Sequence, residues 1–579
     1  MKISTHIYMM IGLAITVYSI SCKKSNSSNN IQPADTTVVI TPPNDPAFAP
    51  TIGFFGNDWS PKTFITPSYI SAAKPTTAAS ATVTVDMSNV MTKVSKYVFG
   101  NNSNLWMGQI VDQPSLVNYL KDLSPNVIRA PAGSVSDVYF FNINPNQKPA
   151  DAPDSLFDTN GNKVPASYWS GKSQESWTFA LDNYYQLLSQ TNSTGIITVN
   201  YGYARYGTSP DPVAAAAHLA ADWVRYDNGR TKFWEIGNES NGVWESGYKI
   251  DVSKNQDGQP EIITGDLYGQ HFKVFADSMK VAAQSIGKTI FIGAQLLDAE
   301  PAAWQTATDK GWNQGVLTQA GIAADFFIVH DYFTAYHTNA GVDEIAGTGI
   351  SVPTNAMIYL KSQFSKYSVT AKPVAMTEWN IESEGSKQKV SHVAGMHAVI
   401  SVAELIKNEF GEASRWDLAN GWANGNDHGL FNIGDEPNAV KWNPRPAFYY
   451  LYYFQKYLGD KMVNTTVSGD NSILSYASSY TSGESGIIVI NKGTAAKVVN
   501  ITLKNFHAGV NFYWHTLTGG TDNGEFSGSV YVNNTAPSGS SGGPLNYSLI
   551  KANAASISGG INISAPPRSV IFIAVQNKK

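Results

Sequence analysis

The 579-residue sequence has little cysteine and little charge. Its single cysteine, Cys22, excludes a disulfide bond within the chain, so the fold must be stabilised by packing. Only 15% of the residues are charged, the formal net charge is −5, and the sequence has no basic run or basic-aromatic stripe, so we expect no nucleic-acid partner. Glycine, asparagine, serine, threonine and aromatic residues are plentiful instead, which is typical of exported, loop-rich proteins that bind neutral polar ligands.

Motifs of nucleotide and metal sites are absent as well. The sequence has no His-Glu-x-x-His motif, no P-loop and no glycine-rich fingerprint after a strand. His330-Asp331 alone does not make a metal site, because a catalytic metal needs three or four converging ligands. We expect neither a metal nor a cofactor.

A short apolar run near the start of the chain has the layout of an export signal. The run Ile7 to Val17 is too short for a membrane span and leads into Ser19-Ile20-Ser21-Cys22. Cysteine after small residues resembles the lipobox of bacterial lipoproteins, which implies residues 1–22 as a signal peptide and Cys22 as a lipidated N-terminus. The alternative is an ordinary signal peptide with an incidental cysteine.

A lipid anchor would place the protein at the bacterial outer membrane, on its periplasmic or its cell-surface face. Lys23-Lys24 is not the acidic run of a surface-export tag, which favours the periplasm. Residues 23–50 are rich in Ser, Asn, Pro and Thr and are expected to form a flexible tether.

The chain is too long for one domain, and residues 96–442 alternate between strand and helix patterns. The alternation predicts a parallel (β/α)₈ barrel of TIM type. Helices are expected after Asp211-Pro212, over Asp266 to Ile286 and over Val390 to Ile406. The eight strands are expected at residues 97–100, 126–129, 195–200, 233–236, 289–293, 325–330, 374–377 and 415–418.

From residue 443 to residue 579, short alternating strands separated by Gly, Ser and Asn clusters predict an antiparallel β-sandwich. Residues 51–95 form an N-terminal extension whose alternating segment Thr82 to Met87 is expected to complete this sandwich. The aromatic run Phe448 to Phe454 crosses the boundary without a linker and is expected to lie buried, partly under the sandwich. We favour a structural role for the sandwich over carbohydrate binding.

Two short apolar runs of the barrel each end in a carboxylate. They are Trp234-Glu235-Ile236-Gly237-Asn238-Glu239 and Met376-Thr377-Glu378-Trp379-Asn380. Their separation, 378 − 239 = 139 residues, leaves room for three βα units, which makes them strands four and seven. Catalytic residues of such barrels lie at the C-terminal ends of the strands. Two carboxylates that converge there are the apparatus of glycosidic bond cleavage, one as acid and one as nucleophile.

Neighbouring residues have expected roles of their own. Asn238 is placed to bind a sugar 2-hydroxyl, and Glu235 is expected to form an ion pair inside the barrel. Trp379 is expected to offer an apolar platform to a sugar. Glu382 and Glu384 are expected to be solvated.

The quoted motifs, together with Tyr201-Gly202-Tyr203, resemble those of clan A retaining glycoside hydrolases, and most closely the family 51 α-L-arabinofuranosidases. The resemblance covers the barrel from about residue 96 to 435 and extends to the sandwich. It implies Glu239 as acid/base, Asn238 as a sugar-binding residue and Glu378 as nucleophile. It also implies an Arg near the nucleophile at the end of strand two, here Arg129.

Further binding residues follow from the same resemblance. His330 or Tyr332, after strand six, would hydrogen-bond the nucleophile, and Trp416 or Trp422, after strand eight, would form a wall of the sugar subsite. Independently of the resemblance, Trp169 and its neighbour Tyr168 lie in a long segment on the catalytic face. There they either stack on a sugar or hold the segment on the barrel.

The identity of the sugar is not determined by the resemblance, because the motifs depart from the family pattern. Ala130-Pro131-Ala132-Gly133 stands where arabinofuranosidases tend to have Pro-Gly-Gly, and Thr377 replaces Asp before the nucleophile. The same scaffold serves β-xylosidases, β-glucuronidases, endo-glucanases and agarases. We expect a plant- or algal-type polysaccharide or oligosaccharide as substrate, with exo or endo action and the oligomeric state left open. A carbohydrate-binding protein without turnover is the alternative class, which the presence of both carboxylates disfavours.

We expect two properties of the catalytic pair. The carboxyl groups should lie about 5–5.5 Å apart, as in retaining enzymes. Glu239 should have the higher pKa of the pair, because Arg129 holds Glu378 anionic.

Overall fold

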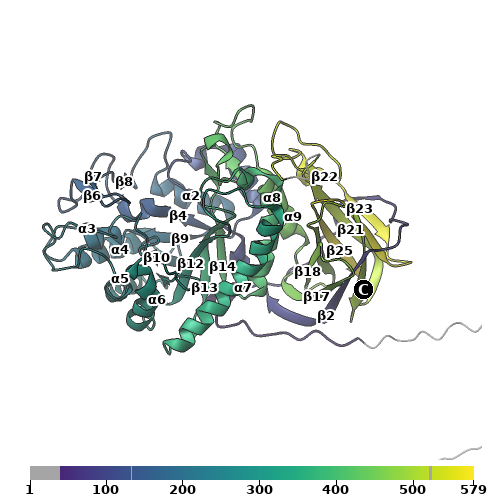
Figure 1. Ribbon diagram of the computed structural model, residues 1–579, viewed down its shortest axis with the longest axis horizontal. Coiled ribbons are helices and arrows are strands. Elements are labelled where there is room, and N and C mark those ends of the chain that lie inside the picture. Colours follow the sequence, from purple (N-terminus) through teal and green to yellow (C-terminus); the bar gives the residue numbers. More distant parts are fainter. Residues whose placement is uncertain (1–39, 132, 521–524, 579) are drawn as a thin grey trace, which may run out of the picture. The chain divides into compact units, whose positions relative to one another are not determined.

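The computed structural model describes residues 40–131, 133–520 and 525–578 (Figure 1). Within this part of the chain, eight parallel strands close a barrel in the order β10-β11-β12-β13-β14-β3-β4-β9, which confirms the expected TIM barrel. The strands are β3 (Gly100–Asn102), β4 (Val127–Ala130), β9 (Thr194–Val199), β10 (Phe233–Ile236), β11 (Phe291–Gln295), β12 (Phe326–Tyr332), β13 (Val374–Asn380) and β14 (Glu412–Arg415).

Helices connect successive barrel strands, and their starts follow local capping chemistry. The Asp211 carboxylate accepts a hydrogen bond from Ala214 N (2.9 Å) and Pro212 occupies the first turn, as the sequence predicts. Thr264 and Thr306 cap the two following long helices in the same way. The connecting helices are α1 (Pro114–Leu123), α2 (Leu181–Thr191), α3 (Gly202–Tyr206), α4 (Pro212–Asp227), α5 (Gly265–Ser285), α6 (Ala307–Ala320), α7 (Val342–Lys366) and α8 (His392–Lys407).

The first and eighth strands differ most from their expected positions. Residues Lys96–Phe99 form a 3-10 turn, and β3 begins only at Gly100, where a Cβ would lie 2.4 Å from Ser414 Oγ of β14. The eighth strand is β14, three residues before the expected segment. It carries Glu412, which is fully buried and bonds Ser414, and a buried acid is not marked by an apolar pattern.

Strands β12 and β13 run further than expected, to Tyr332 and Asn380. Glu378 therefore lies within β13 rather than beyond its end. A register shift between Met376 and Trp379 accommodates it.

The C-terminal sandwich is built on one curled, mostly antiparallel sheet of eleven strands among the described residues, in the order β1-β23-β21-β25-β19-β18-β17-β2-β20-β24, with β22 beside β21. Strand β2 pairs antiparallel with β17 and parallel with β20, which confirms that an N-terminal strand completes the sandwich. The strands are β1 (Tyr69–Ser71), β2 (Ala81–Lys93), β17 (Lys461–Ser468), β18 (Ile473–Ser479), β19 (Ser485–Asn491), β20 (Lys497–Lys504), β21 (Ala508–Thr518), β22 (Tyr531–Val532), β23 (Ala552–Ser556), β24 (Ile561–Ala565) and β25 (Ser569–Asn577).

The end of the expected tether is attached to the sandwich. Asn44 accepts a hydrogen bond from Val90 N (2.9 Å), and Asp45 forms ion pairs with Lys93 (3.2 Å) and Lys461 (2.8 Å). The flexible-tether expectation is therefore wrong for residues 41–50, because these polar side chains find partners on β2 and β17. The expected signal peptide, Cys22 and the first part of the tether fall within residues 1–39, outside the described residues.

The segment after residue 50, to which the sequence alone assigns no role, closes the N-terminal end of the barrel. Phe54 stacks on Phe291 with ring centroids 3.9 Å apart, and Phe55 lies 4.8 Å from Phe233. Phe291 and Phe233 are the first residues of β11 and β10, so these rings fill the end of the barrel opposite the catalytic one.

The aromatic run at the domain boundary forms helix α9 (Pro446–Tyr457), which lies between α8 and the sandwich strands (Figure 1). Every residue from Phe448 to Phe454 is at most 7% exposed, as expected. Phe454 contacts Phe99 on the barrel side, and Tyr453 stacks on Phe572 of β25. One apolar layer thus joins barrel and sandwich.

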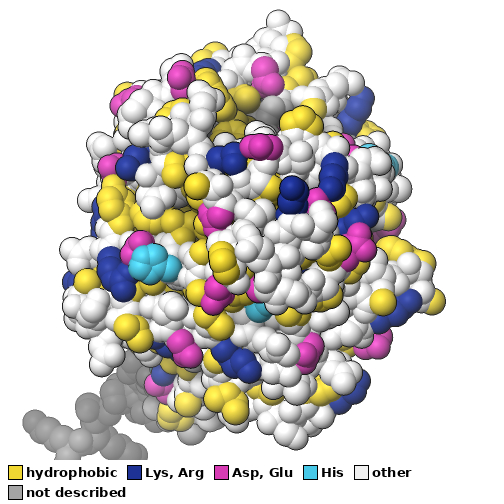
Figure 2. Space-filling view, turned by 90° about the vertical axis from the view of Figure 1, so that its left-hand side faces the viewer, with side chains coloured by type: hydrophobic (Ala, Val, Ile, Leu, Met, Phe, Trp, Pro, Cys, Tyr) yellow, Lys and Arg dark blue, Asp and Glu magenta, His cyan; other side chains and the backbone are white. Residues whose placement is uncertain are grey.

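On the face in Figure 2, which shows the side of β6 (Ser155–Phe157), β7 (Lys163–Pro165) and α3, acidic and basic side chains are interspersed with apolar ones. Among the described residues, no helix combines the length and the apolar character that crossing a membrane requires.

Candidate active site

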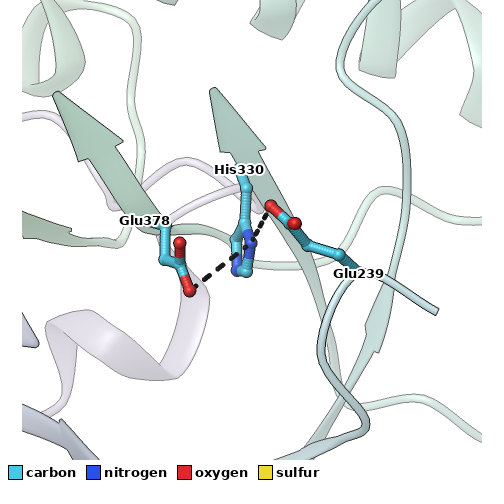
Figure 3. Close-up of side chains that lie close together, drawn as sticks. All are labelled: Glu239, His330 and Glu378. Carbon is cyan, nitrogen blue, oxygen red and sulfur yellow. Dashed lines mark hydrogen bonds and ion pairs between the residues drawn. The ribbon is translucent and has the colours of Figure 1, made fainter. Parts of the chain in front are cut away.

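Three side chains meet at the C-terminal ends of the barrel strands (Figure 3). Glu239 comes from the loop after β10, His330 from β12 and Glu378 from β13. One oxygen of each carboxylate and one ring nitrogen of the histidine all lie within 4.8 Å of one another. His330 Nδ1 is 3.0 Å from Glu239 Oε1 and 3.9 Å from Glu378 Oε1.

Strand β12 supplies a different partner to each carboxylate. Residues two apart on a strand face the same side, so His330 and Tyr332 both point into the barrel. The Tyr332 hydroxyl donates to Glu378 Oε2 (3.0 Å), while His330 bonds Glu239 and, through Nε2, lies 3.0 Å from Thr377 Oγ1. Of the two residues considered as partners of the nucleophile, the structure places Tyr332 on Glu378 and His330 on Glu239.

Arg129 on β4 ties the site together and is fully buried. Its Nη1 donates to Glu378 Oε1 (2.7 Å), its Nη2 to Asn238 Oδ1 (2.8 Å) and its Nε to Glu235 Oε2 (2.7 Å). The contact with Glu235 is the ion pair expected inside the barrel. Burial opposes the charge of the guanidinium, but the two carboxylates outweigh burial and raise the pKa of Arg129.

The backbone after β10 turns sharply to present Asn238 and Glu239. Gly237 has φ +74°, and a Cβ there would lie 2.6 Å from Ser240 Oγ and 2.7 Å from Tyr201 Cβ, so only glycine fits. Glu239 itself has φ +41°, an uncommon conformation for a non-glycine residue.

Three residues beside the pair were not expected from the sequence: Asp137, Trp244 and Glu245. The Asp137 carboxylate accepts hydrogen bonds from the backbone N–H of Tyr201, of Gly202 and of Asn238, and so fixes the loops after β9 and β10. Burial raises the pKa of Asp137 to about 7. Asp137 lies in a short 3-10 helix (Gly133–Val138) and the other two lie in the loop after β10, and neither segment has an apolar periodicity that marks them in the sequence.

Trp244 and Glu245 bond Glu239 and Asn238 directly. The Trp244 indole N–H donates to Glu239 Oε2 (2.9 Å), and Asn238 Nδ2 donates to Glu245 Oε1 (2.9 Å). Both polar ends of the Asn238 amide are therefore held by protein groups, one by Arg129 and one by Glu245.

The protonation of Glu239 depends on His330, a residue that the sequence did not pair with it. Burial alone would raise its pKa, but the hydrogen bond and charge of His330, the Trp244 N–H and the charge of Arg129 outweigh burial, and the pKa of Glu239 is lowered. For His330, burial lowers the pKa, yet Glu378 and Glu239 outweigh burial and the pKa is raised. The expectation that Glu239 has the higher pKa of the pair considered the two carboxylates and Arg129 but not the imidazole.

Two of the tryptophans expected to contact a sugar, Trp379 and Trp169, pack against other aromatic side chains. Trp379 is 1% exposed and packs against Phe333 and His397, so it belongs to the core and offers no platform to a sugar. Trp169, in β8 (Trp169–Ser170), is half-buried with its ring near Trp106 and Trp177.

The two tryptophans considered for the subsite wall lie differently. Trp416 directly follows β14 and reaches the loop after β4, where a Cβ on Gly133 would lie 2.9 Å from its ring. Trp422 lies instead over the guanidinium of Arg445, at 5.5 Å. Trp416 therefore lies beside the segment that follows β4, whereas Trp422 packs on Arg445.

The loop after β13 contains one further correction. Glu382 is fully buried rather than solvated, since it pairs with Lys389 (3.3 Å) and accepts hydrogen bonds from the backbone N–H of His337 and of Ser386. Glu384 is exposed, as expected.

Glu239, His330 and Glu378 are also residue types that ligate cations. The Arg129 guanidinium, 2.7 Å from Glu378, already supplies positive charge there and would repel a metal ion. The arrangement suits acid/base and nucleophilic chemistry on a neutral substrate better than cation binding.

No protein-family profile and no curated protein sequence matches this chain. Solved structures do match it over most of its length. The α-L-arabinofuranosidase of Thermotoga maritima, solved as an arabinose complex, superposes with a TM-score of 0.60 at 18% identity, covering 86% of this chain and 99% of that chain. The chain has the fold of family 51 α-L-arabinofuranosidases.

Other glycoside hydrolases share this fold. A family 51 α-L-arabinofuranosidase from Bifidobacterium longum has a TM-score of 0.58 at 14% identity, covering 86% of this chain and 100% of that chain. CelM2, a bifunctional glucanase-xylanase from a metagenome library, has a TM-score of 0.57 at 14% identity, covering 87% of this chain and 100% of that chain.

Proposed function

We propose that the protein is a retaining glycoside hydrolase that cleaves α-L-arabinofuranosidic bonds in a plant- or algal-type polysaccharide or its oligosaccharides. The observation that carries the proposal is the approach of Glu239 and Glu378, whose nearest oxygens lie within 4.8 Å. Retaining enzymes hold their carboxyl groups about 5–5.5 Å apart, whereas inverting enzymes leave about 6.5–9.5 Å for a water molecule.

The reaction would proceed in two displacements. Glu378 attacks the anomeric carbon while Glu239 donates a proton to the departing glycosidic oxygen, which gives a glycosyl-enzyme ester and a free alcohol. Glu239 then removes a proton from water as that water attacks the anomeric carbon. The C–O bond to Glu378 breaks, and the sugar leaves with its original anomeric configuration.

The surroundings of each carboxylate suit these roles. Arg129 and Tyr332 hold one oxygen each of Glu378 and fix its orientation for attack. Glu239 contacts His330, whose raised pKa makes the imidazole a proton source beside the acid/base. Glu239 can thus receive a proton locally before the first displacement, and it stays ionised after that step to act as the base of the second.

The arabinofuranoside is favoured by the shared fold with family 51 structures and by the Asn238-Glu239 pair. A panel of aryl glycosides (arabinofuranoside, xyloside, glucuronide, glucoside and galactoside) tests this choice. Turnover of another sugar alone would move the proposal to a β-xylosidase, a β-glucuronidase or, with polymeric substrates, an endo-glucanase or agarase.

The mechanism is tested on the same substrates. NMR of the first product should show retained anomeric configuration, and Glu378→Ala should be inactive but rescued by azide with formation of a glycosyl azide of inverted configuration. Glu384→Gln, an exposed carboxylate on the same loop, is the matched control. Inversion by the wild-type enzyme, or sugar binding without turnover of any substrate, would contradict the proposal.

We also propose that the protein is exported and lipid-anchored through Cys22, as the segment before this residue suggests. Expression in a Gram-negative host with labelled palmitate should label the wild-type chain and leave Cys22→Ala unlabelled. Label on Cys22→Ala would contradict the anchor.

A further inference from the structure

The loop after Glu239 folds back on the two residues that precede it. Trp244 bonds Glu239 and Glu245 bonds Asn238, so two consecutive residues hold two other consecutive residues of the site. Backbone hydrogen bonds from Gly242 N to Glu239 O (2.6 Å) and from Glu245 N to Gly242 O (3.0 Å) set this return of the chain. The loop is therefore a short, internally bonded clamp.

Trp244 fixes the rotation of the Glu239 carboxyl group. Its N–H occupies Oε2 while His330 occupies Oε1, so neither oxygen can turn without breaking a contact. The indole is 52% exposed and lies against Gly242, where a Cβ would be 2.5 Å from the ring. A ring this exposed is not needed to fill the core. Its hydrogen bond to Glu239 is therefore the contact that calls for a functional explanation.

Glu245 fixes the amide of Asn238 from the opposite side to Arg129. It is 3% exposed, and its Oε1 accepts hydrogen bonds from Asn238 Nδ2 and from Ser134 Oγ (2.7 Å). Its Oε2 has no hydrogen-bond partner among the described residues. Burial and the neighbouring acids Asp137 and Glu239 raise the pKa of Glu245 well above its ordinary value.

We propose that Trp244 and Glu245 are positioning residues for the hydrolysis: the Trp244 N–H holds the acid/base carboxyl group in the orientation needed for proton transfer, and Glu245, as a hydrogen-bond acceptor, holds the Asn238 amide. This inference rests on the proposed function, because it requires Glu239 to be the acid/base. Among the described residues, the charged and titratable groups that face Glu239 include His330 and Tyr332 from β12, Arg129 from β4, Glu378 from β13 and Glu245.

Trp244→Phe tests the first half of the proposal. The phenyl ring preserves the apolar contact with Gly242 but donates no hydrogen bond, so the Glu239 carboxylate loses one stabilising partner. The basic limb of the kcat/KM–pH profile should move upward by about one pH unit, and kcat on poor leaving groups should fall by about tenfold. The basic limb reports the titration of the coupled Glu239 and His330 pair, not of Glu239 alone. The test therefore compares the pH position of this limb in the variant with its position in the wild-type enzyme.

Trp304→Phe is the matched control, since Trp304 is 86% exposed and lies outside the site. Its pH profile should equal that of wild type. An unchanged profile and unchanged kcat for Trp244→Phe, while Glu239→Gln is impaired, would overturn the positioning role and leave the proposed function intact.

Glu245→Gln and Glu245→Ala test the second half. Glutamine keeps an uncharged oxygen acceptor for Asn238 and Ser134, so it should retain most of kcat/KM. Alanine releases the amide and should lower kcat/KM by about tenfold on the full substrate, yet much less on the 2-deoxy analogue, which cannot use the Asn238 contact.

If Glu245 had a purely structural role, Glu245→Ala would lower kcat/KM equally on the full substrate and on the 2-deoxy analogue. That result would overturn the inference. So would equal losses for Gln and Ala, because they would show that an oxygen acceptor at this position is not sufficient to hold the Asn238 amide. Melting temperatures of both variants identify any loss of folding, and Glu245→Gln, being isosteric, carries the test if Glu245→Ala does not fold. Absence of glycoside turnover by the wild-type enzyme would overturn the proposed function and this inference together.

Discussion

Removing the buried positive charge at the centre of the site should destabilise the whole barrel. Arg129 is fully buried and is the cation within 2.7 Å of both Glu235 and Glu378. In Arg129→Met, both carboxylates would lose this partner in a medium that solvates charge poorly. Breaking one buried pair typically costs about 3–5 kcal/mol, a large part of the roughly 5–15 kcal/mol that stabilises a domain.

A second substitution should recover part of this loss. Glu235 is 0% exposed, so it cannot be solvated after Arg129 is removed, and Glu235→Gln in the Arg129→Met background eliminates that stranded charge. We expect recovery of about 1–3 kcal/mol, the cost of one buried unsatisfied polar group. Glu378, at 4% exposure and bonded by Tyr332, should account for much of the remainder.

Urea unfolding followed by tryptophan fluorescence measures these differences, with Glu235→Gln alone closing the double-mutant cycle. The deficit of Arg129→Met should shrink toward pH 4, where carboxyl groups with ordinary pKa values begin to protonate. A deficit below about 1 kcal/mol at pH 7, the range of an exposed pair, would refute the reasoning, because it would mean that water reaches both carboxylates.

Three further outcomes are expected. Glu239→Gln should lower activity by about 10²–10⁴-fold on poor leaving groups and much less on activated aryl glycosides; equal losses on both would contradict its role as acid. His330→Gln should be less stable than wild type, most of all below about pH 6.5. The pKa of His330 is raised in the folded protein, so the stability that the imidazolium contributes is lost as the pH rises through that pKa. Urea midpoints of the variant and of wild type should therefore converge at high pH. Truncation at residue 440 should give insoluble or inactive protein, because it removes α9 and uncovers the barrel face beneath it; a soluble, fully active fragment would show that the sandwich is a detachable module.

Much of the architecture follows from local pattern. The alternation of apolar strands with capped helices predicts the barrel, and strand β10 occupies the residues expected for it. The alternating segment at Thr82 predicts the strand β2 that completes the sandwich. These features can be predicted from the sequence because side-chain periodicity and capping depend on residues a few positions apart.

The two carboxylates and their partners on strands can be predicted from the sequence for a related reason. Glu239, Glu378 and Arg129 each follow or end an apolar run, and the ends of parallel barrel strands meet at one face. The closeness of Glu239 and Glu378 therefore follows from the order of strands along the chain. The pattern does not say which of His330 and Tyr332 contacts which carboxylate.

Tertiary structure alone decided the remaining features. Trp379 follows Glu378 in sequence but points outward into the core, because adjacent strand residues face opposite sides and the register shifts beside Glu378. Trp244 and Glu245 lie in a loop without periodicity, and their roles depend on how that loop returns to Glu239. The lowered pKa of Glu239 likewise requires an imidazole 91 residues away in sequence. The sequence by itself determined which elements form and where their polar ends gather, since those depend on near neighbours. The orientation and protonation of each group were decided by contacts between distant segments, which only the closed barrel brings together.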